Sequence, residues 1–182
     1  MNYTGRMPQL AAPVVTWRVP LPGPYQARYA TPFAVLGIRT AGGRLTGIQY
    51  LHRGVATLDP LDALAERVCR QVERYLDDPD FRFDLPFDYV GTDFQCRVWR
   101  AISAIPRGRP STYLGLARKL RSAPRPVGGA CGANRIPLVI PCHRVLASQG
   151  IGGFMNARGG FPLEVKRWLL RHEEMEPAAP PS

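Results

Sequence analysis

The chain has 182 residues, 45% of them hydrophobic, and a net charge of +10 at neutral pH. These values predict a soluble protein of one large domain or two small ones, because no apolar run approaches the roughly 20 residues of a membrane span. Residues 1–20 lack the pattern of an export signal, and the four cysteines show no CxxC spacing, so we expect a cytoplasmic protein without a disulfide frame.

The positive charge is concentrated in the second half of the chain. Residues 1–90 carry 10 basic and 9 acidic residues, whereas residues 91–182 carry 14 basic and 5 acidic ones. Between Arg97 and Arg144 there are ten basic residues and no acid. Such a segment favours a polyanionic partner, most simply nucleic acid. A generally basic, solvated surface is the alternative.

The first half alternates strand and helix patterns. In chain order we expect an edge strand at Val14–Val19, a β-hairpin with strands Phe33–Arg39 and Arg44–Leu51 around a glycine turn, a helix over Leu61–Leu76, and an extended connector over Phe81–Val90. Asp59 or Asp62 can cap the helix, and Cys69 lies on its apolar stripe. Cys69 is therefore interpreted as a packing residue.

A domain boundary is predicted near Gly91, where the charge changes. The helices expected beyond it are Phe94–Ile105, Tyr113–Leu120, Pro126–Ala133 and Leu163–His172, followed by a disordered tail at Pro177–Ser182. Cys96 falls off the apolar stripe of its helix. The fold class is α/β (α+β), with a small α/β domain over 1–90 and a mainly helical domain over 91–176. Two short helices joined by a tight link inside an acid-free stretch indicate a helix-turn-helix in the second domain.

The helix at Pro126–Ala133 has unusually small side chains. Each of its glycines weakens a helix by roughly 1 kcal/mol relative to alanine, so a compensating reason is needed, such as close approach to another backbone. The smooth helix could enter a narrow groove, or it could pack tightly inside the protein. Arg125 lies between Pro124 and Pro126. Because a residue before proline is disfavoured in α geometry, we expect Arg125 to project from the helix entrance.

One stretch carries the chemistry: Leu138 to Ile140 runs into Pro141, Cys142 and His143. The apolar run predicts a buried strand that ends at Pro141, with Cys142 at its mouth. The thiolate is the nucleophilic form of cysteine, and His143 is the candidate base that would generate it. The alternative is a buried cysteine that only packs.

The second half resembles the O6-alkylguanine-DNA alkyltransferases. The residues that match the family pattern are Phe94-Gln95 with Val98-Trp99, Ile105-Pro106 with Gly108, Tyr113 with Leu116-Ala117, Arg125 with Val127-Gly128 and Ala130, Asn134 with Pro137, Ile140 to Val145, and Lys166 with Leu169-Leu170 and Glu173. They occur in order over nearly all of the second half. The first half resembles the family only loosely, through Thr31 to Phe33 and the hairpin.

The resemblance implies a single-turnover repair reaction without a cofactor. Cys142 would take the alkyl group from guanine O6, and also from thymine O4, and keep it as a thioether. His143 would activate the thiol through a water molecule while Glu173 holds its tautomer. Tyr113 would protonate the departing guanine, and Asn134 would brace the site.

The resemblance also implies how DNA is bound. The alkylated base would be extruded from double-stranded DNA, at a cost of a few kcal/mol, and Arg125 would fill the space it leaves. The helix bearing Val127, Gly128, Gly129 and Ala130, together with Tyr113, would lie in the minor groove. Val145, Phe154 and Met155 are expected to line the substrate pocket. The protein would act as a monomer associated with the nucleoid.

Some positions depart from the family's usual residues. Pro110, Pro126, Cys131 and Arg135 replace other residues, and the loop from Gly153 to Pro162 is longer, with Phe154 where a tyrosine is usual. No zinc site is expected, because the first half offers only His52 and Cys69 as strong ligands. Two other functions stay open: a non-catalytic binder of alkylated DNA, and a hydrolase that uses Cys142, His143 and Glu173.

Overall fold

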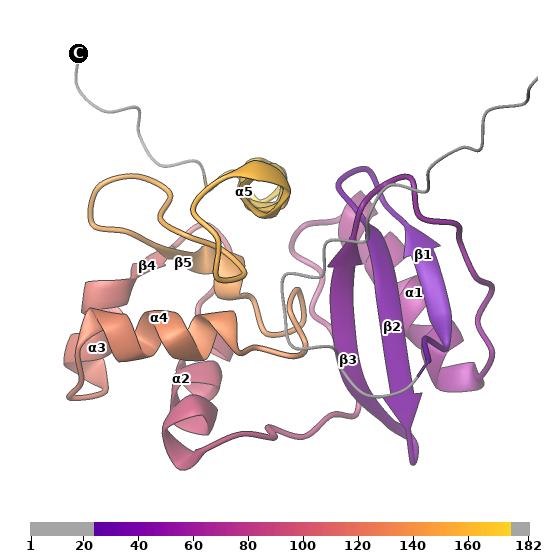
Figure 1. Ribbon diagram of the computed structural model, residues 1–182, viewed down its shortest axis with the longest axis horizontal. Helices are drawn as coiled ribbons and strands as arrows, with labels where there is room; N and C mark the ends of the chain where they lie inside the picture. Colours follow the sequence, from indigo (N-terminus) through magenta and orange to yellow (C-terminus); the bar gives the residue numbers. More distant parts are fainter. Residues whose placement is uncertain (1–23, 176–182) are drawn as a thin grey trace, which may run out of the picture.

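The computed structural model describes residues 24–175, in which a small sheet and a group of short helices lie side by side (Figure 1). Its elements are β1 (Ala27–Ala30), β2 (Val35–Ala41), β3 (Arg44–Leu51), α1 (Ala63–Asp77), α2 (Asp93–Ser103), β4 (Ser111–Thr112), α3 (Tyr113–Lys119), α4 (Pro124–Gly132), the 3-10 turn η1 (Cys142–Arg144), β5 (Val145–Leu146) and α5 (Gly160–His172). The expected strand at Val14–Val19 and the expected tail at Pro177–Ser182 lie outside the described residues.

The first half is an antiparallel sheet of order β1-β2-β3 with α1 packed against it. The predicted hairpin is confirmed: Ala41 pairs with Arg44, and Gly42 and Gly43 both have positive φ, as a two-residue turn between twisted strands requires. The predicted helix is also confirmed as α1, and the Asp62 carboxylate caps it by accepting from the Ala65 N–H at 2.7 Å.

The second half begins with α2, which confirms the helix predicted there. Thr92 and Gln95 form a capping box at its first turn, so two backbone N–H groups without helical partners are satisfied. Helices α3 and α4 pack against each other, and α4 also packs on α2. The two short strands β4 and β5 pair in parallel, which brings the start of α3 beside the end of η1.

Helix α4 starts two residues earlier than predicted. Pro124 is its first residue and Arg125 lies inside the first turn, so the expectation that Arg125 stands outside the helix is wrong. The N–H groups of a first turn have no partner within the helix, and prolines at these positions therefore cost no hydrogen bond. Arg125 is nevertheless exposed.

Residues 138–140 do not form the predicted strand. Leu138 has φ +76°, and the Ile140 N–H bonds the Ile136 carbonyl at 2.9 Å, so the run folds back as a tight turn. Leu138 and Ile140 are buried, whereas Val139 between them is half-buried. The apolar pattern therefore predicted burial for two of the three residues but not the backbone geometry, an ambiguity inherent in short apolar runs.

One continuous set of buried side chains extends through both halves, from Ala27 in β1 to Leu169 in α5. Cys69 belongs to it, as predicted, and burial raises the pKa of this thiol to about 11. Cys96 also belongs to this buried set, contrary to expectation. Its thiol faces the connector before α2 and donates to the Tyr89 carbonyl at 3.3 Å. No helix within residues 24–175 is long and apolar enough to cross a membrane.

Candidate active site

Cys142 is the first residue of the 3-10 turn η1 and is only 3% exposed. Its backbone N–H bonds the Ile140 carbonyl at 2.8 Å, and the Arg144 N–H bonds the Pro141 carbonyl at 2.9 Å, so the turn is closed on both sides. The cysteine lines a cavity of about 240 Å³, whose other lining residues are Tyr113, Gly128, Cys131, Gly132, Gly153, Phe154, Met155, Asn156, Ala157 and Arg158. The thiol can therefore meet a ligand without reaching the outer surface.

Asn134 holds the backbone and the thiol together. Its side-chain N–H₂ group donates to the Ile140 carbonyl at 2.9 Å and to the Cys142 sulfur at 3.3 Å. Its side-chain oxygen accepts from the Ile136 N–H at 2.9 Å. The side chain is completely buried, so these bonds face no competition from water. An amide that donates to sulfur stabilises the thiolate relative to the thiol.

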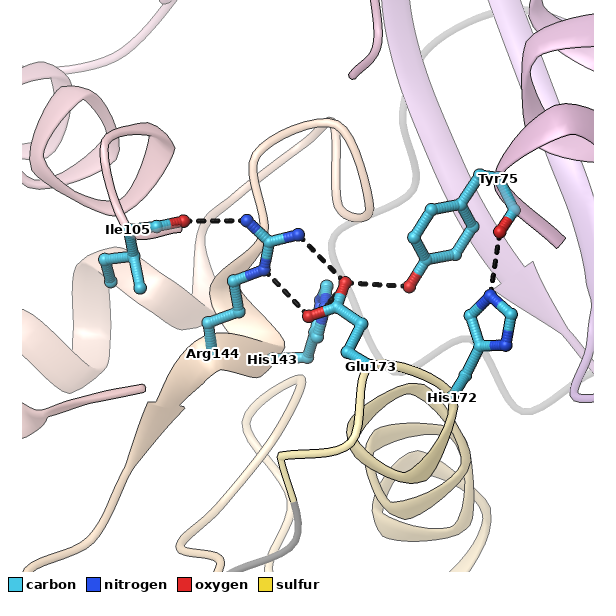
Figure 2. A network of polar contacts seen from close by, with 6 residues as sticks. All are labelled: Tyr75, Ile105, His143, Arg144, His172 and Glu173. Carbon is cyan, nitrogen blue, oxygen red and sulfur yellow. Dashed lines mark hydrogen bonds and ion pairs between the residues drawn. The ribbon is translucent and has the colours of Figure 1, made fainter. Parts of the chain in front are cut away.

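His143 is also completely buried and pairs with Glu173 (Figure 2). Its Nε2 lies 2.9 Å from the Glu173 carboxylate. Burial lowers the pKa of His143, although Glu173 opposes the effect, so the imidazole is neutral at neutral pH. A carboxylate only accepts hydrogen bonds, which assigns the single ring proton to Nε2. The other nitrogen, Nδ1, is then an unprotonated base, and it has no hydrogen-bond partner among the described residues.

Glu173 accepts hydrogen bonds from three different side chains, of which Figure 2 shows the bonds from Arg144 and Tyr75 clearly. Besides His143, Arg144 donates to both carboxylate oxygens at 2.8 and 3.0 Å, and the Tyr75 hydroxyl donates at 2.9 Å. Burial alone would raise the pKa of Glu173, but His143 and Arg144 outweigh it and hold the pKa well below its ordinary value. The carboxylate therefore stays ionised and fixes the imidazole ring.

Arg144 and Tyr75 extend this network to other elements. Arg144 also donates to the Ile105 carbonyl at 2.7 Å, just after α2. Tyr75 comes from α1, and its own carbonyl accepts from His172 at 2.7 Å. One carboxylate at the end of α5 thus connects the turn that carries Cys142 to helices from both halves of the chain.

Tyr113 and Lys166 meet at the carbonyl of Gly153. The Tyr113 hydroxyl donates to it at 3.0 Å, and the Lys166 ammonium at 2.9 Å. Lys166 also donates to the Val145 carbonyl at 2.7 Å. Burial raises the pKa of Tyr113, so its phenol stays protonated, and burial lowers the pKa of Lys166 to about 8. Tyr113 thus presents a neutral proton donor to the cavity.

The residues expected in the substrate pocket divide into two groups. Phe154 and Met155 line the cavity and are 5% and 4% exposed. Val145 is completely buried and does not line the cavity; its carbonyl instead anchors Lys166. Asn156 packs so closely on Gly132 of α4 that a Cβ at that glycine would overlap its amide. The small-sided helix was expected to approach another backbone, but this contact is with a side chain, and a Cβ at Gly128 or Gly129 would meet no other part of residues 24–175.

The residues expected to bind DNA are also divided between the two faces of α4. Arg125 and Gly129 are exposed and Gly128 is half-buried, whereas Val127 and Ala130 are buried. The Ala130 carbonyl accepts from the Trp99 indole N–H at 2.8 Å. The side chains of Val127 and Ala130 therefore hold α4 on the body, which leaves Arg125 and the glycines to meet a partner.

Several residues at the site were not among those predicted for it, including Tyr75, Arg144 and Arg158. Arg144 stands beside the Cys142-His143 pair and could have been found from its position. Tyr75 is 98 residues away from Glu173 in the chain, and nothing local indicates their contact. Lys166 was noted only as a residue that matches the family pattern, and no role at the site was predicted for it. No group of three or more His, Cys, Asp or Glu side chains suited to a metal ion occurs within residues 24–175.

Comparison with known proteins gives a consistent result. Residues 93–175 match the family model described as 6-O-methylguanine DNA methyltransferase, DNA binding domain. The regulatory protein Ada of Salmonella typhimurium is 44% identical over 119 residues, which are 63% of this chain and 32% of that protein. A DNA base-flipping protein of Thermus thermophilus is 40% identical over 115 residues, covering 61% of this chain and 74% of that protein. The chain spans less than two thirds of several curated relatives it matches.

Solved structures extend the similarity to the first half. An O6-methylguanine methyltransferase of Mycobacterium tuberculosis is 31% identical with a TM-score of 0.68, and the match covers 86% of this chain and 96% of that protein. The same bacterium's protein in complex with DNA is 31% identical with a TM-score of 0.66, covering 82% and 92%. The fold described above is therefore shared over almost the whole of that neighbour.

Proposed function

We propose that this chain, which belongs to the O6-methylguanine-DNA methyltransferase family, repairs DNA by moving an alkyl group from guanine O6 to Cys142. One observation carries the proposal: the Cys142 thiol lines a cavity while the residue beside it, His143, is held by a buried carboxylate. A packing cysteine would need neither the cavity nor the charged network. O4-alkylthymine, which presents the same kind of alkyl ether, is the second substrate.

The reaction balances as an in-line displacement. His143 Nδ1 removes the thiol proton through a bridging water, and the resulting thiolate attacks the alkyl carbon. A carbon–sulfur bond forms as the carbon–oxygen bond breaks, and its electron pair leaves with guanine. Tyr113, which stays protonated and lines the cavity, supplies the proton that neutralises the departing base. The thioether is stable, so each molecule reacts once.

Glu173 and Asn134 are positioning residues in this scheme. Glu173 keeps the proton of His143 on Nε2, which leaves Nδ1 free to act as the base. Asn134 fixes the Cys142 sulfur and supports its negative charge with an N–H donor. The roles match the general logic of an activated nucleophile, in which the base is itself oriented by a third group.

The DNA partner of the reaction is a duplex approached through its minor groove. Helices α3 and α4 act as a helix-turn-helix, and the smooth exposed face of α4 with Gly128 and Gly129 meets the groove. Guanine O6 faces the base stack, so the base must be extruded into the cavity. Arg125, exposed in the first turn of α4, occupies the space left behind. One molecule suffices for each lesion, on chromosomal DNA.

Two other functions are less well supported. The Thermus thermophilus relative is named a DNA base-flipping protein, so binding without transfer is a real alternative. The presence of Cys142, which lines the cavity and accepts a hydrogen bond from Asn134, favours transfer. A hydrolase would have no use for the acid-free basic segment between Arg97 and Arg144.

The test is mass spectrometry after incubation with a duplex that contains O6-methylguanine. We expect every active molecule to gain one methyl group on Cys142, with no further turnover. The Cys142→Ser variant should gain none, whereas Cys69→Ser, which changes a buried thiol of α1, should react like the parent. Tight binding without methyl gain would support the base-flipping alternative, and turnover of an ester would support the hydrolase.

A further inference from the structure

Arg158 is a cation at the cavity that no step of the proposed reaction uses. It lies among the residues that line the cavity with Cys142, and its side chain is exposed. It forms no hydrogen bond, ion pair or ring contact with any other residue of the described range 24–175. By contrast, the Arg144 guanidinium donates hydrogen bonds to the Glu173 carboxylate and to the Ile105 carbonyl.

The backbone that carries Arg158 is held in place. Phe154 and Ala157 exchange both backbone hydrogen bonds at 2.9 Å, and the two residues between them, Met155 and Asn156, have φ of +52° and +60°. This is the geometry of a two-residue hairpin turn, in which asparagine tolerates positive φ well. Arg158 follows directly after the closed pair. The turn therefore fixes the backbone from which the Arg158 side chain lines the cavity.

The turn is itself anchored to the protein body. Phe154 and Met155 are buried, and the preceding Gly153 carbonyl accepts from both Tyr113 and Lys166. Asn156 packs on Gly132 of α4. Binding by Arg158 therefore has to order only its side chain, because the backbone that carries it is already held.

The charge of Arg158 has no counterpart at the cavity. None of the residues that line it is acidic, and the sequence has no acid between Asp93 and Glu164. Guanine is uncharged and needs no cation for recognition. A nucleotide that enters the cavity brings its flanking phosphodiesters to the entrance, and a guanidinium binds phosphate oxygens with paired hydrogen bonds.

We propose that Arg158 binds a backbone phosphate next to the extruded nucleotide and so selects a lesion within a polynucleotide over a free alkylated base. This inference rests on the proposed function. The ligand is a phosphodiester, and Arg158 is a positioning residue, because it would contact the phosphate and none of the reacting atoms. Arg158 would bind the phosphate of the damaged strand in both single-stranded and duplex DNA. Arg125, in contrast, would act only in a duplex, where it fills the space that the extruded base leaves.

The experiment compares Arg158→Ala with the parent on three substrates: duplex DNA with O6-methylguanine, the same strand alone, and free O6-benzylguanine. We expect the second-order alkylation rate to fall about tenfold on both DNAs, the loss of one charge-assisted hydrogen bond, with no change on the free base. The dependence of log rate on log salt should become shallower by about one for the duplex. Arg158→Lys should recover part of the loss.

The matched control is Arg82→Ala, which removes an equal charge from an exposed residue on the connector, outside the cavity. If Arg158→Ala behaves like Arg82→Ala on DNA, or if it slows the free base equally, the assignment of Arg158 is wrong. Failure of the proposed function would look different. In that case the parent protein itself would not be alkylated on Cys142 by any of the three substrates.

Discussion

Lys166 places its ammonium group in the protein interior, where water does not solvate it. The side chain is completely buried, and its two hydrogen bonds go to the carbonyls of Val145 and Gly153. The rings of Tyr113 and Phe154 lie 5.7 and 5.8 Å from the nitrogen. Burial lowers the pKa of Lys166 to about 8, so the charge is partly lost already in mildly alkaline solution.

This depressed pKa predicts a pH dependence of stability. Between pH 8 and pH 10.5 the unfolded chain holds the Lys166 proton while the folded chain has released it, so stability rises with pH. Relative to a Lys166→Met variant, the free energy of unfolding of the parent should increase by about 3 kcal/mol across this window. Urea unfolding at a series of pH values measures the difference.

A control removes one of the two thiols that act on the charge of Lys166 from the comparison. Cys142 is the proposed nucleophile, so the series is repeated in a background with the other change, Cys131→Ala. A parent-minus-variant difference that stays flat from pH 8 to 10.5 in both backgrounds would show that Lys166 is solvated in the folded protein.

Single residues of the site were predictable to different degrees. Cys142 and His143 were candidates from their own neighbourhood, but a thiol beside an imidazole is more often a packing pair, and only the residues matched over the whole second half favoured chemistry. The role of Glu173 came only from the family resemblance. Tyr75 was not predictable, because a tyrosine on the apolar stripe of a helix looks like core, and only the fold brings its hydroxyl to a carboxylate 98 residues later.

At the scale of elements, helix α4 combines a packing face with an exposed first turn. Its inner face holds Val127 and Ala130 against the body, and its first turn presents Arg125. The helix was predictable because its prolines and small residues have clear positional meaning. Its start was not, since two prolines in a first turn satisfy the same backbone requirements as one.

The exposed place of Arg125 predicts a defect limited to duplex DNA. Arg125→Ala should slow alkylation of Cys142 by a duplex lesion by about tenfold or more, because the cost of extruding the base is no longer offset. Reaction with the same lesion in a single strand and with free O6-benzylguanine should change little. Quenched-flow measurement of alkylated protein on the three substrates provides the comparison.

Arg125→Lys serves as the matched variant, since it keeps the charge but not the planar guanidinium. Partial recovery with lysine is expected for a residue that occupies space in the stack. Equal losses of Arg125→Ala on duplex, single strand and free base would instead mean that the residue supports the fold of α4.

The loop elements were the least predictable. The run from Leu138 to Ile140 has the composition of a strand, yet it folds as a turn around the positive φ of Leu138. Within residues 24–175 the run pairs with none of the five strands, although β3 reaches Arg135 just before it through one backbone hydrogen bond. Tertiary context, which a short apolar pattern does not contain, decided the outcome.

At the scale of the whole molecule, the predicted α/β organisation is confirmed, and the two halves share their interior. The Ile48 N–H in β3 bonds the Arg135 carbonyl at 2.9 Å, just before the turn that leads to Cys142. The Tyr75 hydroxyl in α1 bonds Glu173. The predicted boundary near Gly91 marks a change in charge and in secondary structure. The contacts across it connect the first half directly to the site.

This connection predicts an effect of the first half on the reaction. Tyr75→Phe keeps the ring that packs on Phe83 and His172 but removes the hydrogen bond to Glu173. We expect a loss of about 1–3 kcal/mol in the free energy of unfolding, because a buried carboxylate loses a donor. The alkylation rate of Cys142 should fall as well, since His143 is less firmly held.

The comparison variant is Tyr89→Phe, whose hydroxyl donates to Ser103 at an exposed position, 3.1 Å away. It should cost little in stability and leave the rate unchanged. If the two phenylalanine variants are equally stable and equally reactive, the Tyr75 hydroxyl has no part in holding the site.

The hydroxyl of Tyr75 also determines how much of the chain would have to be moved into another protein to keep the site intact. A graft of residues 93–175 into another polypeptide would carry the nucleophile, the base and the carboxylate, but would leave one donor to that carboxylate behind. A segment that keeps all the donors to this carboxylate has to include α1, which carries Tyr75, and extend to Glu173 just after α5. A host protein offering less would have to provide its own phenol at the same spot.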